Sequence, residues 1–338
     1  MVFCRSTVAL LRGTGSLSRQ TMLWAILLLS VGLRGSPLSA EAAYGPYGPE
    51  GTRMREQLWI LPSGDPARPM RATVFQPAAL DPGVKRPVVV INHGTDETTR
   101  LAVAMPVYYW LSRWFVERGY VVVLPQRRGH GATGGELSES VGSCENADHY
   151  ASGAIAANDI AAAVDYMIRQ PFVQTSNAVV VGISTGGWAS LALAARNPPN
   201  VAAIVNFAGG RGGHAYGQAN EVCNSAGLEL AIRLFGARSR IPTSWYYAEN
   251  DSFFGPHLVD GLSRGWRNAG GSLEAHFLAP YETEGHSIAD DRAGWDLWGK
   301  TLEVFLHRVA SGNVVSLKKH AKGPRAILVA ASSSRQTQ

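Results

Sequence analysis

The feature that most constrains this 338-residue chain is the pentapeptide Gly182-Ile183-Ser184-Thr185-Gly186, which directly follows the apolar run 178–181. The run has the composition of a buried strand, and the residues after the pentapeptide favour a helix. The turn between them must be sharp, and glycines on both sides of the serine avoid steric collisions there. Such a turn lifts the serine Oγ clear of the sheet edge at a helix N-terminus. We predict that Ser184 is a nucleophile, the alternative being an ordinary glycine-rich turn.

The rest of the chain alternates strand-like and helix-like segments, the pattern of a mostly parallel sheet covered by helices on both faces. This places the protein in the α/β class. We expect residues 43–55 to form a leader and the first two strands to pair as an antiparallel hairpin at the sheet edge. The predicted strands are 58–61, 71–75, 87–91, 120–124, 178–181, 201–205, 241–247 and 272–278. The predicted helices are 106–117, 155–169, the segment from the pentapeptide to 196, 228–235, 256–268 and 295–309.

The two ends of the chain differ in composition from the body. Arginines precede an apolar stretch of about a dozen residues, and Ala40-Glu41-Ala42 follows, so residues 1–42 are predicted to be a secretory signal peptide. A permanent membrane anchor is the less favoured alternative because about twenty apolar residues are needed to span a bilayer. Met22 is an alternative start. We expect an exported protein, periplasmic or secreted, with one domain over residues 43–310 and a basic flexible tail over residues 311–338.

The net charge of +5 comes from those ends. Residues 1–42 and 311–338 hold nine of the 31 basic residues and one of the 26 acidic ones. The segment between them therefore has 22 basic and 25 acidic residues, a net charge of −3. A domain without cationic excess is a poor partner for nucleic acid, so we predict none. The composition does not indicate an oligomeric state.

Two segments depart from the simple alternation, residues 129–150 and 209–240. Both follow strands and would run past the carboxyl ends of the sheet, where open α/β sheets bind ligands. They are short and predict a partial cover over the site. Each holds one cysteine, Cys144 and Cys223, and an even pair in an exported chain favours a disulfide between them. Two unpaired buried thiols are the alternative.

A serine nucleophile needs a base within hydrogen-bond reach, and that base needs an orienting acid. In a strand–turn–helix site of this kind the chain order is Ser, acid, His. Asp251 follows the predicted strand 241–247, and His286 falls in a polar loop after the last strand. Glu249 is the competing acid, and a turn-capping role is the alternative for Asp251. The order favours Ser184, Asp251 and His286.

An oxyanion hole needs two amide donors. The amide of Thr185 follows the nucleophile, and the loop after the strand 87–91 offers the amide of Thr95, next to Gly94. We interpret His93 as a residue that braces this loop. No histidine pair has the spacing of a metal site, so neither a metal nor any other cofactor is predicted.

Aromatic side chains near the predicted site suggest an apolar acyl or aryl group, with Trp188, Tyr247 and Phe253 as candidate substrate contacts. Ordinary core packing is the alternative for them. Acidic residues crowd the first insertion, and we interpret them as a solvated loop, the alternative being recognition of a substrate amine. These are Glu136, Glu139, Glu145 and Asp148.

Residues 56–310 resemble the dienelactone hydrolase-like branch of the α/β-hydrolase superfamily, which neighbours the prolyl-oligopeptidase-type serine peptidases. The matching motifs are His93-Gly94, Arg127-Arg128-Gly129-His130-Gly131, Gly182-Ile183-Ser184-Thr185-Gly186-Gly187, Glu249-Asn250-Asp251-Ser252-Phe253-Phe254 and Gly285-His286. The resemblance implies an α/β-hydrolase fold. Dienelactone hydrolases carry cysteine where this chain has Ser184, which favours an esterase over a lactone hydrolase.

The resulting expectation is a serine hydrolase that cleaves small-molecule carboxylic esters through an acyl-enzyme. Related peptidases usually add a large N-terminal domain, for which we expect no room in this chain. A small serine peptidase or amidase with the same triad is nevertheless the second hypothesis. The third is a catalytically silent α/β-hydrolase fold that serves as a binding module.

Overall fold

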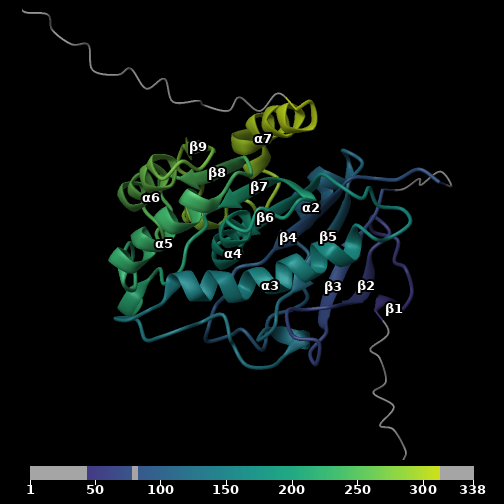
Figure 1. The fold of residues 1–338 in the computed structure, drawn as a ribbon, viewed down its shortest axis with the longest axis horizontal. Coiled ribbons are helices and arrows are strands. Elements are labelled where there is room, and N and C mark those ends of the chain that lie inside the picture. Colours follow the sequence, from purple (N-terminus) through teal and green to yellow (C-terminus); the bar gives the residue numbers. More distant parts are fainter. Residues whose placement is uncertain (1–43, 78–82, 313–338) are drawn as a thin grey trace, which may run out of the picture. The chain divides into compact units, whose positions relative to one another are not determined.

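The computed structural model describes residues 44–77 and 83–312, so the predicted signal peptide and most of the basic tail lie outside the described residues. Within them, nine strands form one sheet (Figure 1). The strands are β1 (Gly45–Tyr47), β2 (Gln57–Leu61), β3 (Met70–Phe75), β4 (Val88–Asn92), β5 (Val121–Gln126), β6 (Ala178–Ile183), β7 (Val201–Phe207), β8 (Thr243–Ala248) and β9 (Leu273–Leu278).

The sheet has the order β1-β2-β3-β5-β4-β6-β7-β8-β9. Strands β4 to β9 run parallel to one another, whereas the pairs β1–β2, β2–β3 and β3–β5 are antiparallel. The predicted hairpin is therefore confirmed, but it is not the sheet edge. Residues 45–47, predicted as part of a leader, form the edge strand because their extended backbone pairs with the open side of β2.

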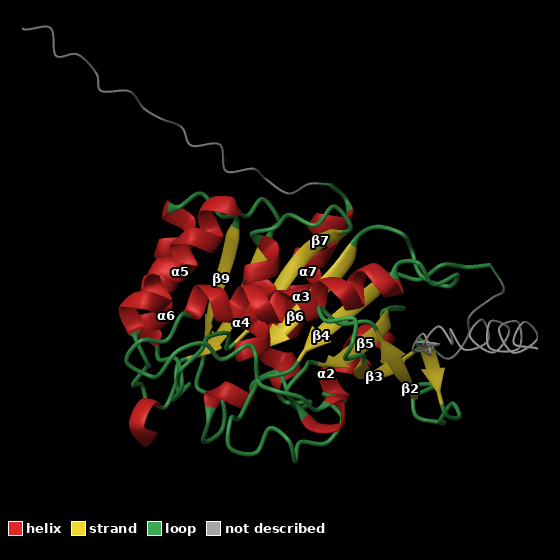
Figure 2. Ribbon diagram, turned by 60° about the horizontal axis from the view of Figure 1, so that its bottom comes forward, coloured by secondary structure: helices red, strands yellow, loops and turns green. Residues whose placement is uncertain are grey.

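Helices cover both faces of this sheet, as the alternating pattern predicted (Figure 2). They are α2 (Tyr109–Val116), α3 (His149–Met167), α4 (Thr185–Ala194), α5 (Ser225–Arg238), α6 (Pro256–Asn268) and α7 (Gly294–Ala310). One core lies between the sheet and α3 to α6, and a second lies between the opposite face and α2 with α7. None of these described helices is long and apolar enough to cross a membrane.

Three helices differ from the sequence prediction by three or more residues at one end or both. Helix α3 begins six residues early because the Asp148 side chain accepts a hydrogen bond from the Ala151 amide at 2.8 Å and caps the helix at that point. Helix α2 begins three residues late because Tyr108 has a left-handed backbone, with φ 34° and ψ 62°. Helix α5 extends the short helix predicted at 228–235 by several residues at each end.

The two insertions are joined by a Cys144–Cys223 disulfide, as predicted. The bond closes a sequence separation of 79 residues. A second contact reinforces it, since His149 Nε2 lies 2.7 Å from the carbonyl oxygen of Cys223. Residues near the start of α3 are thereby fixed to the segment after β7.

Candidate active site

Ser184 occupies a strained turn between β6 and α4. Its backbone has φ 54° and ψ −123°, a region that non-glycine residues rarely adopt outside functional sites. A Cβ atom added to Gly182 would lie 2.2 Å from the Gly186 carbonyl oxygen, and one added to Gly186 would lie 2.2 Å from the Asn92 carbonyl oxygen. The turn can therefore form only with glycine on both sides, which is the geometry that the pentapeptide predicted.

The register of the sheet brings the loop after β4 against the nucleophile. Asn92 pairs with Gly182 across the parallel strands β4 and β6, so the residues two further along each strand are neighbours. A Cβ atom added to Gly94 would lie 3.0 Å from Ser184 Cβ and 3.6 Å from its Oγ. Only glycine lets the loop approach the serine this closely.

Two backbone amides next to the serine are candidate oxyanion donors. Thr185 is the first residue of α4, so its N–H has no acceptor within the helix. The Gly94 N–H donates to the Tyr108 hydroxyl at 3.4 Å. For Thr95 N–H we find no acceptor among the described residues. The two residues predicted from the sequence to supply these amides, Thr185 and Thr95, are neighbours, since their hydroxyls lie 2.8 Å apart.

Asp251 and His286 meet at the same sheet edge. Asp251 follows β8 and is 1% exposed, and His286 Nδ1 lies 3.1 Å from each of its carboxylate oxygens. The same carboxylate accepts hydrogen bonds from the amides of Phe253 and Phe254 at 2.9 and 3.0 Å. Asp251 therefore holds its own turn and orients the imidazole, whereas the competing Glu249 is exposed.

The imidazole is held from several sides. The Phe253 ring stacks on it with centroids 4.2 Å apart. The Glu284 carboxylate accepts the His286 amide at 2.9 Å and also accepts the amide and the hydroxyl of Ser252. Burial would raise the pKa of Glu284, but these hydrogen bonds hold it below its ordinary value. Sequence reasoning missed Glu284; its position two residues before His286, at the start of a short helical turn, was the available signal.

A series of contacts through Gly210 and Phe254 connects the segment of Ser184 with the imidazole of His286. The Gly210 amide donates to the Ser184 carbonyl oxygen at 3.2 Å, and a Cβ atom on Gly210 would lie 2.5 Å from the Phe254 ring. That ring is in turn 5.6 Å from the ring of His286. The described residues show no hydrogen bond between Ser184 Oγ and His286. Catalytic hydrogen bonds are often long in the absence of substrate and tighten in the substrate complex.

A buried ion pair lies behind the candidate oxyanion amides. The Arg127 guanidinium, which is inaccessible to solvent, donates two hydrogen bonds to Glu139 at 2.8 and 3.0 Å. Burial alone would raise the pKa of Glu139, but the charge and hydrogen bonds of Arg127 hold it well below its ordinary value. The prediction of a solvated acidic loop is therefore wrong for Glu139. Asp148 and Glu145 are exposed, as predicted, although Asp148 also caps α3 and Glu145 also accepts from the Tyr216 hydroxyl at 2.8 Å.

His93 braces the loop after β4, as predicted. Its Nε2 accepts the Arg127 amide at 3.0 Å, so the proton of the neutral ring is on Nδ1, which lies 2.6 Å from the Gly94 carbonyl oxygen. Burial and the charge of Arg127 lower the pKa of His93 well below its ordinary value. His93 is therefore neutral and serves as a structural link.

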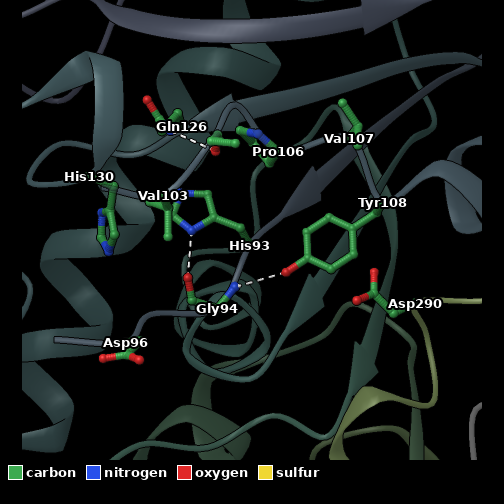
Figure 3. A pocket seen from close by; sticks show the side chains of 11 residues that line it. His93, Gly94, Asp96, Val103, Pro106, Val107, Tyr108, Gln126, His130 and Asp290 are labelled. Carbon is green, nitrogen blue, oxygen red and sulfur yellow. Dashed lines mark hydrogen bonds between the residues drawn. The ribbon is translucent and has the colours of Figure 1, made fainter. Parts of the chain in front are cut away.

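A cavity of about 280 Å³ opens beside Gly94 (Figure 3). The Tyr108 hydroxyl points to the Gly94 amide at its wall, and burial together with the Asp290 carboxylate raises the pKa of Tyr108 to about 12. The cavity is not lined by Ser184, Asp251 or His286, and it borders the nucleophile only through Gly94. It is lined by His93, Gly94, Asp96, Val103, Ala104, Pro106, Val107, Tyr108, Gln126, His130 and Asp290.

Two of the three aromatic residues predicted to contact substrate are core residues instead. Trp188 is 0% exposed, and its indole N–H donates to the His149 carbonyl oxygen at 2.8 Å. Tyr247 is also buried, and its hydroxyl donates to the Gly209 carbonyl oxygen at 2.6 Å. Both side chains contribute to core packing, which was the alternative to substrate contact. Phe253 alone remains partly exposed next to His286.

Comparison with known proteins gives a family match over part of the chain and solved structures with a similar fold. Residues 106–210 match the prolyl oligopeptidase family, Peptidase_S9. A stretch of 144 residues is 28% identical to dipeptidyl-peptidase 5 of Porphyromonas gingivalis and covers 41% of this chain and 19% of that protein. The crystal structure of dipeptidyl peptidase 4 from the same organism superposes with a TM-score of 0.56 at 14% identity, over 77% of this chain and 36% of that one. The structure of Est1E from Butyrivibrio proteoclasticus superposes with a TM-score of 0.51 at 12% identity, and the match covers 75% of this chain and 99% of Est1E.

This chain thus has the α/β-hydrolase fold, and its residues 106–210 are similar to the prolyl oligopeptidase family. It matches about a fifth of the length of the curated relative and about a third of the dipeptidyl peptidase 4 chain. The solved structures share the fold, and the family match includes the strained turn at Ser184.

Proposed function

We propose that this protein is a serine hydrolase that cleaves carboxylic esters through an acyl-enzyme intermediate. The observation that supports this most strongly is the strained turn at Ser184, at the same sheet edge as the Asp251–His286 pair. A strained, glycine-flanked serine is costly to fold and is typical of a functional site.

In the proposed reaction, Ser184 Oγ attacks the ester carbonyl carbon as His286 Nε2 accepts the hydroxyl proton. The amides of Thr185 and Thr95 donate to the oxyanion of the tetrahedral intermediate. The C–O bond to the leaving group breaks, and His286 gives its proton to the departing alcohol. A water molecule then attacks the acyl-enzyme by the same steps, which releases the carboxylic acid and restores the serine. Asp251 stabilises the imidazolium form in both halves of the reaction.

Two features of the structure support this choice of substrate. The first is the size of the cavity, which suits a small substrate group, and the second is the pairing of the acidic residues in the first insertion. The volume of about 280 Å³ is at the low end for pockets that hold drug-sized ligands, and one wall is aliphatic. Recognition of a substrate amine by the first insertion is disfavoured because three of its four carboxylates have structural partners, Arg127 for Glu139 among them.

A peptidase or amidase is the second candidate. The match to the prolyl oligopeptidase family and the relative named as a dipeptidyl-peptidase favour it. So do the carboxylates of Asp96 and Asp290, which line the cavity and could attract a substrate amine. Both candidates use the same three residues.

The test compares p-nitrophenyl butyrate with alanine p-nitroanilide, which carries a free amine and releases a chromophore from an amide. We expect turnover of the ester to exceed that of the anilide and to vanish in Ser184→Ala. Faster turnover of the anilide identifies a peptidase. Absence of turnover on both substrates by the folded protein contradicts the proposal and favours a silent fold.

A further inference from the structure

We propose that a hydrogen bond between two threonine hydroxyls sets the spacing of the oxyanion hole. This inference rests on the function proposed above. The Thr185 hydroxyl donates to the Thr95 hydroxyl at 2.8 Å. These are the side chains of the same two residues whose amides are the candidate oxyanion donors, so one short bond, here called the hydroxyl bridge, links the donors directly.

The hydroxyl bridge connects two amide donors that belong to different elements of the fold. One donor begins helix α4 and the other lies in the loop after β4, 90 residues earlier in the sequence. No single element of backbone fixes the distance between them. Oxyanion donors must lie within about 2.7–3.1 Å of the developing charge, so that distance decides how well both can bind it.

The hydroxyl bridge is anchored to the buried ion pair. Thr95 Oγ1 donates to Glu139 at 3.1 Å, and Arg127 Nη2 lies 3.4 Å from both threonine hydroxyls. The hydrogen bonds therefore run from Thr185 through Thr95 to a carboxylate, and a charged acceptor strengthens such a series. Arg127 also donates to the His93 carbonyl oxygen at 2.7 Å and so fixes the loop one residue before Gly94.

The remaining neighbours leave the direction of the bridge unchanged. His130 Nε2 lies 2.9 Å from Thr95 Oγ1, and burial lowers the pKa of His130, so the ring is neutral. Its Nδ1 faces the carbonyl oxygens of Arg127 and Arg128 at 3.2 Å and carries the proton. Nε2 is then an acceptor that competes with Glu139 for the single Thr95 hydroxyl hydrogen, and with either acceptor the Thr95 oxygen stays free to accept from Thr185. Arg127 and Glu139 are positioning residues, since they act on the donors through the hydroxyls.

The test replaces each threonine by valine, which keeps the shape and removes the hydroxyl. We expect Thr185→Val and Thr95→Val to lower kcat about 10- to 100-fold on the best ester substrate with KM nearly unchanged, because a misplaced donor weakens transition-state binding. Thr185→Ser and Thr95→Ser keep the hydroxyl and should recover most of the rate. If the bridge is the shared cause, the double valine variant should cost no more than the worse single variant.

Thr73→Val is the matched control. Thr73 lies in β3, its side chain is buried, and its hydroxyl has no hydrogen-bond partner among the described residues, so valine there tests the same chemical change away from the site. It should leave kcat unchanged. Thermal unfolding of every variant shows that the fold is retained, and if one valine variant does not fold, the other single variant tests the same bond.

Two results would overturn the inference. One is unchanged kcat in both single valine variants, and the other is additive loss in the double variant. These outcomes are distinct from failure of the proposed function, in which the unmodified protein would itself have no turnover dependent on Ser184.

Discussion

Alanine at Gly186 gives a sharp test of how the active-site turn is built. Helix propensity alone predicts a gain of about 1 kcal/mol from this change, because Gly186 lies in the first turn of α4. The structure predicts the opposite sign. The new Cβ would lie 2.2 Å from the carbonyl oxygen of Asn92 and 2.5 Å from that of His93.

The size of the effect follows from that contact. The Cβ must retreat by about 1 Å, and both opposing atoms belong to backbone at the end of β4, which cannot rotate away. Overpacking of this kind costs about 1–3 kcal/mol of unfolding free energy, which exceeds the propensity gain. A displacement of about 1 Å between the nucleophile and the oxyanion loop should also lower kcat about 100-fold.

Urea unfolding measures the first effect, and ester turnover measures the second. Gly261→Ala is the control, since Gly261 lies within α6 and a Cβ there would meet no atom within 4 Å in the described part of the chain outside the local helix backbone. It should raise the unfolding free energy by about 0.5–1 kcal/mol and leave turnover unchanged. The reasoning is refuted if Gly186→Ala is as stable and as active as the unmodified protein.

Three further predictions concern the acid, the buried ion pair and the disulfide. Asp251→Asn should lower kcat about 10³- to 10⁴-fold in ester turnover, because the imidazole loses its orienting carboxylate; a loss below tenfold would contradict that role. The pKa of Glu139 is depressed in the folded state, so its contribution to stability is complete above its unfolded pKa near 4.5 and is lost as the pH falls below it. The unfolding free energy should therefore fall more steeply between about pH 5 and pH 3 in the unmodified protein than in Glu139→Gln, and equal slopes would refute the assignment. Replacing Cys144 and Cys223 by serine should lower the free energy of unfolding in urea by up to about 4 kcal/mol. An unchanged free energy of unfolding would show that the disulfide does not stabilise the fold.

Local patterns were enough to predict most of the fold. Helix α6 begins and ends where Pro256 and Asn268 indicated, and the turn at Ser184 follows from glycine positions that admit no side chain. The central strands β4 and β6 are buried along their whole length, so both read as nearly continuous apolar runs. The short strand β1 was missed because three residues are too few to show an alternating pattern.

The supporting side chains of the site could not be predicted in the same way. Glu139 resembles a solvated acid in sequence, and only the tertiary fold shows that Arg127 removes it from water. Trp188 and Tyr247 were mistaken for substrate contacts because large aromatic residues suit a core and a pocket equally well. Asp251 was distinguished from Glu249 by its place in the turn, and the burial of its carboxylate agrees with that choice.

The central claim is that Ser184 is an activated nucleophile, and covalent labelling tests it most directly. The protein is treated with a fluorophosphonate, and the site of modification is located by peptide mass spectrometry. We predict one added phosphonyl group on Ser184, no labelling of Ser184→Ala, and labelling slowed at least 100-fold in His286→Ala. An unmodified Ser184 in the folded, disulfide-bonded protein would contradict the account.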